Sequence, residues 1–135
     1  METVRLSGMN VRGSRERPLK LLLFWPPLLL CTYLALVPNP DDIVIGLPDT
    51  FQHALAFAYL TFALWWVHYE SSFGFEVIGW MVGYGILLEL VQSFVPERSA
   101  EFSDVAIDAV GIAVGYVGYR GYLMVRRMIE GSLGA

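Results

Sequence analysis

Charged residues are scarce in this 135-residue chain, and cysteine is nearly absent. Asp, Glu, Lys and Arg make up 16% of the sequence, against roughly 25% in a typical soluble domain. So few charges cannot cover a water-facing surface, which excludes an ordinary soluble enzyme and a disordered chain. The formal net charge of -4 lacks the basic footprint of a nucleic-acid binder, so we expect no nucleic-acid partner. The single Cys31 excludes a disulfide framework and a cysteine-rich metal site.

Hydrophobic residues are abundant instead, at 56% of the chain, and the mean hydropathy is +0.52. They form four long stretches with almost no charge, at 19–37, 50–67, 73–95 and 105–125. Each is close to the roughly 20 residues that a helix needs to cross a bilayer. The sequence therefore predicts an all-α fold, an integral membrane four-helix bundle over 19–127, with a basic tail at 1–18 and a short tail at 128–135. A cleaved signal peptide is the alternative for the first stretch, which is longer than a usual signal core and lacks an A-x-A-like cleavage site.

The Lys and Arg residues predict how these spans are oriented. Four precede the first stretch and a fifth, Lys20, lies at its start, and Arg126 and Arg127 follow the last, whereas the connection 38–48 has none and 96–103 has only Arg98. By the positive-inside rule, both termini are cytoplasmic and those two connections face outward. We therefore expect a multi-pass protein of a cytoplasmic membrane.

Ionisable and amide side chains interrupt the hydrophobic stretches at their predicted outer ends. Asp49 and His53 lie four residues apart, so both lie on one helix face. Ionisable groups inside a membrane are functional candidates by default, because inserting a charge is costly. This polar cluster consists of Asp49, His53, Glu89, Gln92, Asp104 and Asp108, with Arg98 in the adjoining connection.

A structural role is the alternative reading of the polar cluster, since cross-helix hydrogen bonds in a membrane contribute about 0.6–2 kcal/mol each. Four carboxylates at one depth favour a ligand or catalytic site, because they repel one another unless a proton, Arg98 or a metal ion lies among them. Two G-x-x-x-G pairs, Gly79 with Gly83 and Gly111 with Gly115, predict close helix packing.

Three polar motifs, taken in order, are similar to those of the VanZ-like membrane proteins. They cover residues 49 to 115, and one position departs from the family pattern, because Asp108 stands where the family commonly has Asn. The resemblance implies a small integral membrane protein of the bacterial cell envelope. It also implies a possible link to resistance against glycopeptide antibiotics of the teicoplanin type. The motifs are Asp49-x-x-x-His53-x-x-Ala56-Phe57-x-x-Leu60, Gly85-x-x-x-Glu89-x-x-Gln92-x-Phe94-x-Pro96-x-Arg98 and Asp104-x-x-x-Asp108-x-x-Gly111-x-x-x-Gly115.

One functional hypothesis is an outer-leaflet site for an anionic amphiphile, a phospholipid or a polyprenyl-phosphate cell-wall carrier. The tail would lie in the bilayer while the head group meets the polar cluster. Arg98 suits phosphate oxygens because its guanidinium is a planar fork. We assign substrate binding to Arg98, Gln92, Asp104 and Asp108.

The same hypothesis gives the chemical step to three other residues. His53 is the candidate general acid or base, with Asp49 orienting its ring, and Glu89 completes the catalytic set. Glu89, Asp104 and Asp108 are also candidate oxygen ligands for Mg²⁺ or Ca²⁺. No motif defines a reaction, and the sequence names no cofactor.

The second hypothesis is a non-catalytic scaffold whose buried polar network only stabilises the bundle. Under it, Arg98 neutralises Glu89 or Asp104, and His53 bonds Gln92 or Asp108. A channel would need a homo-oligomer, because four helices enclose little lumen.

Overall fold

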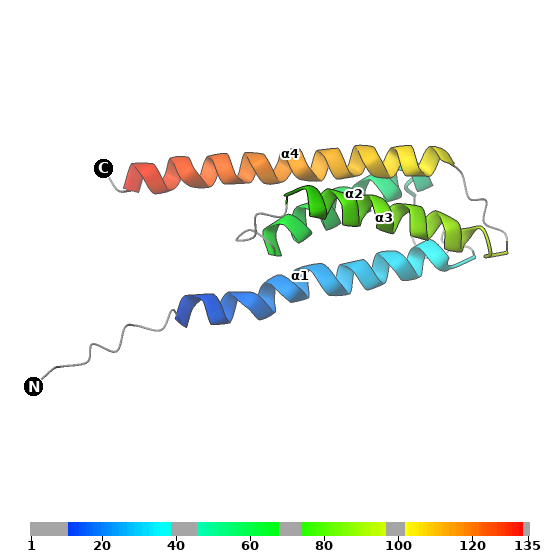
Figure 1. Cartoon of the computed structure of the whole chain (residues 1–135), viewed down its shortest axis with the longest axis horizontal. Coiled ribbons are helices and arrows are strands. Elements are labelled where there is room, and N and C mark those ends of the chain that lie inside the picture. Colours follow the sequence, from blue (N-terminus) through cyan, green and yellow to red (C-terminus); the bar gives the residue numbers. More distant parts are fainter. Residues whose placement is uncertain (1–10, 39–45, 68–73, 97–101, 134–135) are drawn as a thin grey trace, which may run out of the picture.

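The computed structural model describes residues 11–38, 46–67, 74–96 and 102–133 (Figure 1). These residues form four α-helices, and no strand occurs within the described ranges. The helices are α1 (Val11–Leu36), α2 (Asp49–Val67), α3 (Gly74–Gln92) and α4 (Phe102–Leu133). The all-α prediction is therefore confirmed.

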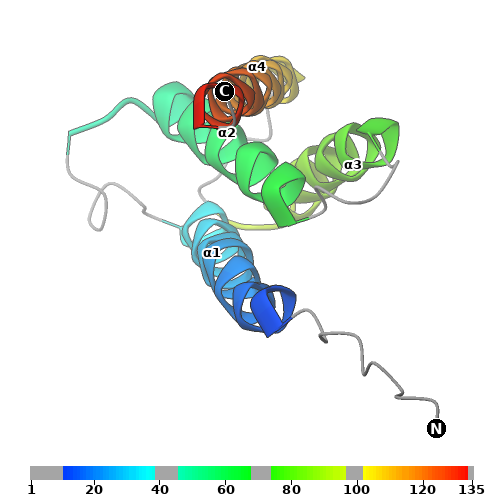
Figure 2. The ribbon, with the colours of Figure 1, turned by 90° about the vertical axis from the view of Figure 1, so that its left-hand side faces the viewer.

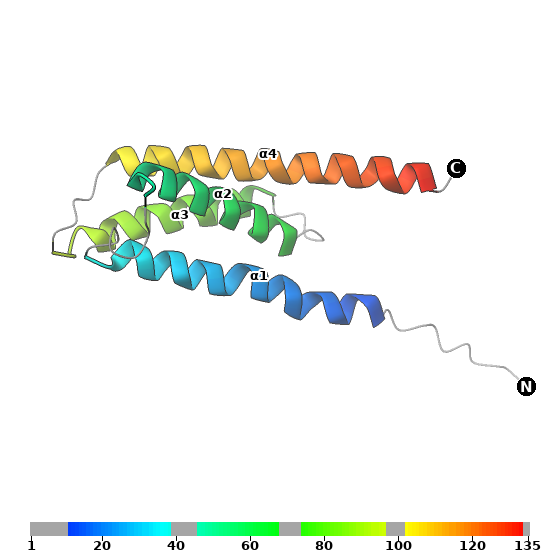
Figure 3. The ribbon, with the colours of Figure 1, turned by 180° about the vertical axis from the view of Figure 1, so that it is seen from behind.

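Consecutive helices run in opposite directions (Figures 1 and 3). As a result, α1 ends, α2 begins, α3 ends and α4 begins at one end of the bundle, which we call the site end. The start of α1 and the end of α4 both lie at the opposite end, on different sides of the bundle. Viewed along the bundle, α2 lies between α1 and α4 (Figure 2), and it contacts all three other helices.

The most extensive helix contact joins α2 and α4, and two glycines make it possible. A Cβ atom on Gly111 would lie 2.5 Å from the carbonyl oxygen of Ala54. A Cβ on Gly115 would likewise collide with the carbonyl oxygen of Ala58. Small residues of this kind let helix backbones approach closely. The packing predicted for this G-x-x-x-G pair is confirmed.

The other G-x-x-x-G pair behaves differently. A Cβ added to Gly79 or Gly83 would meet no atom within 4 Å, and both glycines are exposed. The prediction of close packing for this pair is therefore wrong among the described residues of the chain. The reason is rotational: α3 turns Met81 and Gly85 inward, and these two glycines lie on the outward part of its surface.

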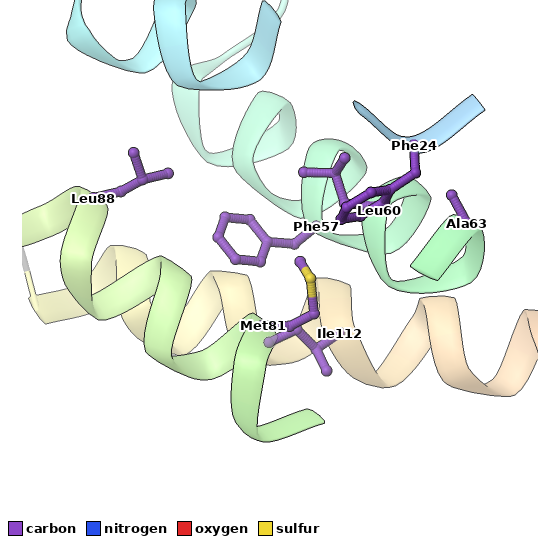
Figure 4. Packing of buried hydrophobic residues seen from close by; sticks show 7 residues of the cluster. All are labelled: Phe24, Phe57, Leu60, Ala63, Met81, Leu88 and Ile112. Atoms are coloured by element: carbon purple, nitrogen blue, oxygen red, sulfur yellow. The ribbon is translucent and has the colours of Figure 1, made fainter. Parts of the chain in front are cut away.

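Side chains from all four helices build the hydrophobic core (Figure 4). Phe57 of α2 is 2% exposed and lies between α3 and α4, and Leu60, one turn further, is fully buried. The core cluster comprises Phe24, Phe57, Leu60, Ala63, Met81, Leu88 and Ile112. Because α2 supplies the centre of this core, packing fixes the position of the start of α2 at the site end.

Two described helical segments, Pro18–Leu36 and Gly74–Gln92, are long and apolar enough to cross a membrane by length and composition. The same measure, applied to the described residues, does not select α2 or α4. Polar side chains lower the hydropathy of both: α2 carries Gln52 and His53, and α4 carries Asp104, Asp108 and Arg120.

The helix bounds differ from the predicted spans mainly at the end away from the site. α1 begins at Val11, inside the stretch predicted only as a basic tail, and α4 continues to Leu133. An ion pair between Arg126 and Glu130, 2.8 Å long, supports this last part of α4, as expected for opposite charges four residues apart. Hydropathy marks where a span ends, and a helix can continue beyond that point.

Candidate functional site

The site end gathers most of the predicted site residues from three helices. Asp49 and His53 lie in the first turns of α2, Glu89 and Gln92 in the last turns of α3, and Asp104 and Asp108 in the first turns of α4. Ligand atoms of Asp49, His53 and Asp104 lie within 4.8 Å of one another, and so do those of His53, Glu89 and Asp108. Five predicted residues therefore meet around His53.

His53 and Asp108 form the central contact of the site. The Nδ1 atom of His53 donates a hydrogen bond to Oδ1 of Asp108, with 3.2 Å between the two atoms. His53 is 8% exposed and Asp108 is 2% exposed. Gly111, one turn after Asp108, permits the close approach of α2 and α4 that brings the two side chains within reach.

The partner of the His53 ring differs from the catalytic hypothesis and is one of the two that the scaffold hypothesis named. The catalytic hypothesis expected Asp49 to orient the imidazole, but Nδ1 donates its hydrogen bond to Asp108, a residue assigned to substrate binding. The reason is tertiary: Asp49 shares a helix with His53, whereas Asp108 reaches the ring from the facing helix across the glycine contact. Asp49 is exposed and lies in the group with His53 and Asp104.

The second oxygen of Asp108 points toward α3. Oδ2 is buried and has no hydrogen-bond partner among the described residues. A Cβ atom on Gly85 would lie 2.8 Å from this oxygen. Gly85 therefore lets Oδ2 pack closely against α3, and Glu89 follows it one turn later on the same helix.

The structure regroups the candidate metal ligands. The sequence suggested Glu89, Asp104 and Asp108 as one oxygen set for Mg²⁺ or Ca²⁺. In the structure, Glu89 and Asp108 group with His53, and Asp104 groups with His53 and Asp49. His53 is thus common to both groups, a role that the sequence analysis did not give it, although its spacing from Asp49 is visible in the sequence.

Gln92 serves the packing of α1. Its Nε2 atom donates a 2.9 Å hydrogen bond to the carbonyl oxygen of Ala35, near the end of α1, and the residue is 3% exposed. We assigned Gln92 to substrate binding, but its amide nitrogen is engaged by the backbone of a neighbouring helix. Arg98, the predicted phosphate ligand, lies outside the described residues.

A cavity of about 240 Å³ adjoins the polar residues, between α1, α2 and α3. Its wall includes His53 and Asp49 at one side and is otherwise largely apolar. Apolar wall residues include Leu34, Leu47, Ala56, Phe57, Leu60 and Leu88.

The sequence analysis missed the contribution of α1 to this cavity. Cys31, Leu34 and Ala35 line it, and Thr32 fixes their helix by accepting a 2.8 Å hydrogen bond from the Tyr84 hydroxyl of α3. No pattern in the sequence signals this face, because α1 is apolar on all sides around these residues.

A family model for VanZ/LLP1 matches residues 12–126 of the chain. The search of curated proteins found no match, and neither did the search of solved structures. The matched range contains α2 and α3 entirely, nearly all of α1 and most of α4, and thus every residue of the polar cluster. The chain therefore belongs to the VanZ/LLP1 family.

Proposed function

We propose that all four helices cross a bacterial cytoplasmic membrane, with the site end at the outer face and both termini in the cytoplasm. Large apolar side chains on every helix support this arrangement because they are exposed: Leu22 is 64% exposed, Phe51 59%, Trp80 76% and Val117 65%. Soluble monomers rarely present so much apolar surface. The arrangement gives α2 and α4 lipid-facing sides, while His53 of α2 and Asp108 of α4 are buried in the bundle interior.

We propose further that the site binds an anionic amphiphile, a phospholipid or a polyprenyl-phosphate lipid. The observation that carries this proposal is the apolar cavity that begins at His53. At about 240 Å³ it is smaller than the roughly 300–1,000 Å³ of pockets that enclose a whole drug-sized ligand. It suits one segment of a hydrocarbon chain, whose polar head then lies beside His53 and Asp49.

An acid–base step on the head group is the chemistry that the site supports. The hydrogen bond to Asp108 holds His53 Nδ1, so proton transfer falls to Nε2. Asp49 and Glu89 are the further acid–base candidates, and Arg98 keeps its predicted role as the phosphate ligand. The head group and the carboxylates of the site are all negative and would repel one another. The proposal therefore includes a cation beside the head group.

Photo-crosslinking in nanodiscs tests the lipid proposal. A phosphatidylglycerol with a diazirine in its acyl chain should label cavity residues of α1 and α3. Leu88→Trp fills the cavity and should reduce this labelling several-fold, whereas Leu87→Trp, on the 55% exposed neighbour, should not. Equal labelling in both variants would contradict the cavity assignment.

Competition between the same probe and other lipids tests which head group the site prefers. Phosphatidylglycerol and a polyprenyl phosphate should compete with the probe better than the zwitterionic phosphatidylcholine. If His53→Gln keeps full competition and full complementation of a deletion strain, the acid–base role is lost and the scaffold hypothesis gains. Teicoplanin susceptibility of the deletion strain tests the antibiotic link separately.

A further inference from the structure

We propose that His53, Glu89 and Asp108 form a binding site for one divalent transition-metal ion, such as Zn²⁺ or Mn²⁺. The three side chains come from three different helices, α2, α3 and α4. Each offers a ligand atom, and these atoms lie within 4.8 Å of one another. The site deepens the proposed function by supplying its cation, but metal binding itself does not depend on any lipid.

Both carboxylate ligands of the proposed site are buried. Glu89 is 8% exposed and Asp108 is 2% exposed, so two carboxylates occupy a region that water hardly reaches. Buried charges require compensation. A divalent cation with a neutral imidazole balances the formal charges of the two carboxylates.

One carboxylate oxygen of Asp108 lacks a hydrogen-bond partner. Its Oδ2 atom is buried and has no hydrogen-bond partner among the described residues, although buried polar atoms in native structures nearly always have one. The atom faces Gly85, where a Cβ would lie 2.8 Å away. The absence of a side chain on Gly85 lets this oxygen pack against α3, one turn before Glu89. An ion shared between Asp108 and Glu89 provides the missing partner.

The spacing of His53 and Asp108 fits a shared ion. At metal–ligand distances of about 2.0–2.2 Å, two ligands of a tetrahedral ion lie about 3.4 Å apart. His53 Nδ1 and Asp108 Oδ1 are 3.2 Å apart, close to this separation. The same distance suits a hydrogen bond, so the experiment must distinguish an ion from a proton between the two atoms.

The donor types select the class of metal. Mg²⁺ and Ca²⁺ take oxygen ligands, whereas an imidazole with carboxylates suits Zn²⁺, Mn²⁺ and Fe²⁺. Asp49 and Asp104 add two further oxygens near His53, on the more exposed side of the ring. The sequence suggested a set of oxygen ligands only. Because the structure adds an imidazole to the set, it favours a transition metal.

Cobalt titration tests this inference on the full chain in detergent, carrying no polyhistidine tag and stripped with a chelator. We expect Co²⁺ to produce visible absorption bands that saturate at one ion per chain and disappear when Zn²⁺ is added. Glu89→Gln should abolish the bands, whereas Glu76→Gln, on an exposed carboxylate of the same helix, should retain them. Bands that are absent from the wild type, or that survive Glu89→Gln, would overturn the proposal.

A second measurement on the wild-type chain covers the case in which Glu89→Gln fails to fold. X-ray absorption at the zinc edge should show imidazole scattering and only nitrogen or oxygen ligands. A sulfur shell, which would assign the ion to Cys31, or a spectrum of hydrated zinc alone would reject the site. Because no lipid is added, the metal result and the lipid labelling succeed or fail independently.

Discussion

Asp108 shows how one side chain connects three helices. It belongs to α4, accepts a hydrogen bond from His53 of α2, and directs its second oxygen toward Gly85 of α3. Both oxygens are therefore placed by backbones that approach closely only because glycines face them. Substitutions at Asp108 and Gly85 can therefore test three properties separately: the hydrogen bond to His53, the charge of the carboxylate and the packing beside Oδ2.

Two substitutions of Asp108 separate its hydrogen bond from its charge. Asp108→Asn should be tolerated in chelator-treated protein, because an amide oxygen can still accept from His53 Nδ1 and the family commonly has Asn here. Asp108→Leu should destabilise the fold by about 1–3 kcal/mol, because it leaves the buried imidazole donor unpaired. Thermal unfolding in detergent measures both. The interpretation fails if the two variants lose the same stability.

Gly85 tests the space beside Asp108. Gly85→Ala should destabilise the bundle by about 1–3 kcal/mol, the usual cost of overpacking, because the new Cβ would lie 2.8 Å from Asp108 Oδ2 and 3.3 Å from the Phe57 ring. Gly83→Ala is the matched control on the same helix, since nothing lies within 4 Å of its Cβ position. The control should gain about 0.5–1 kcal/mol from helix propensity. Equal shifts in melting temperature would contradict the geometry.

At the scale of the helices, the α2–α4 contact is the main support of the site. Gly111 and Gly115 face backbone carbonyl oxygens of α2 rather than flexible side chains. A backbone carbonyl cannot rotate away without breaking its own helix hydrogen bond. The distance between the two helices is therefore fixed, and with it the distance between His53 and Asp108.

Substitution of Gly111 should separate α2 from α4. We expect Gly111→Ala to cost about 3 kcal/mol, the upper part of the usual overpacking range, and to reduce chemical crosslinking between cysteines placed at His53 and Asp108. Gly121→Ala, where a Cβ meets nothing within 4 Å, is the control for helix propensity. Wild-type stability in both variants would show that the contact is looser than described.

The sequence was sufficient to predict the four helices and the meeting of their three polar faces at one end. Long apolar stretches define helices by themselves, and antiparallel order follows from short connections, so Asp49, Glu89 and Asp104 could be placed at one end in advance. The partner of His53 could not be chosen in advance, because the sequence offered Asp49, Gln92 and Asp108, and the choice depends on the rotation of α4 against α2. The cavity could not be predicted either, because residues 21–36 of α1 are almost entirely apolar and their inward face depends on hydrogen bonds with Tyr84 and Gln92.

At the scale of the whole molecule, charge is divided between the two ends. The carboxylates of the polar cluster lie at the site end, where α2 and α4 begin, whereas Arg126 and Arg127 lie near the opposite end, where α4 finishes. α1 begins at that same opposite end (Figure 1). Such a separation matches the positive-inside rule for an even number of spans, and it supports our proposal that the cavity opens toward the outer leaflet.

Thiol labelling of intact cells tests this orientation. Cys31 is replaced by Ala, and single cysteines are introduced at Asn39, Ser71 and Ser99, one in each connection between helices. A membrane-impermeant maleimide should label positions 39 and 99 but not 71, because the proposed topology has the connections at the site end outside and the α2–α3 connection in the cytoplasm. Permeabilised cells provide the control, in which position 71 must also react. Labelling of position 71 alone in intact cells would invert the topology and move the site, with its cavity and its metal ligands, to the cytoplasmic leaflet.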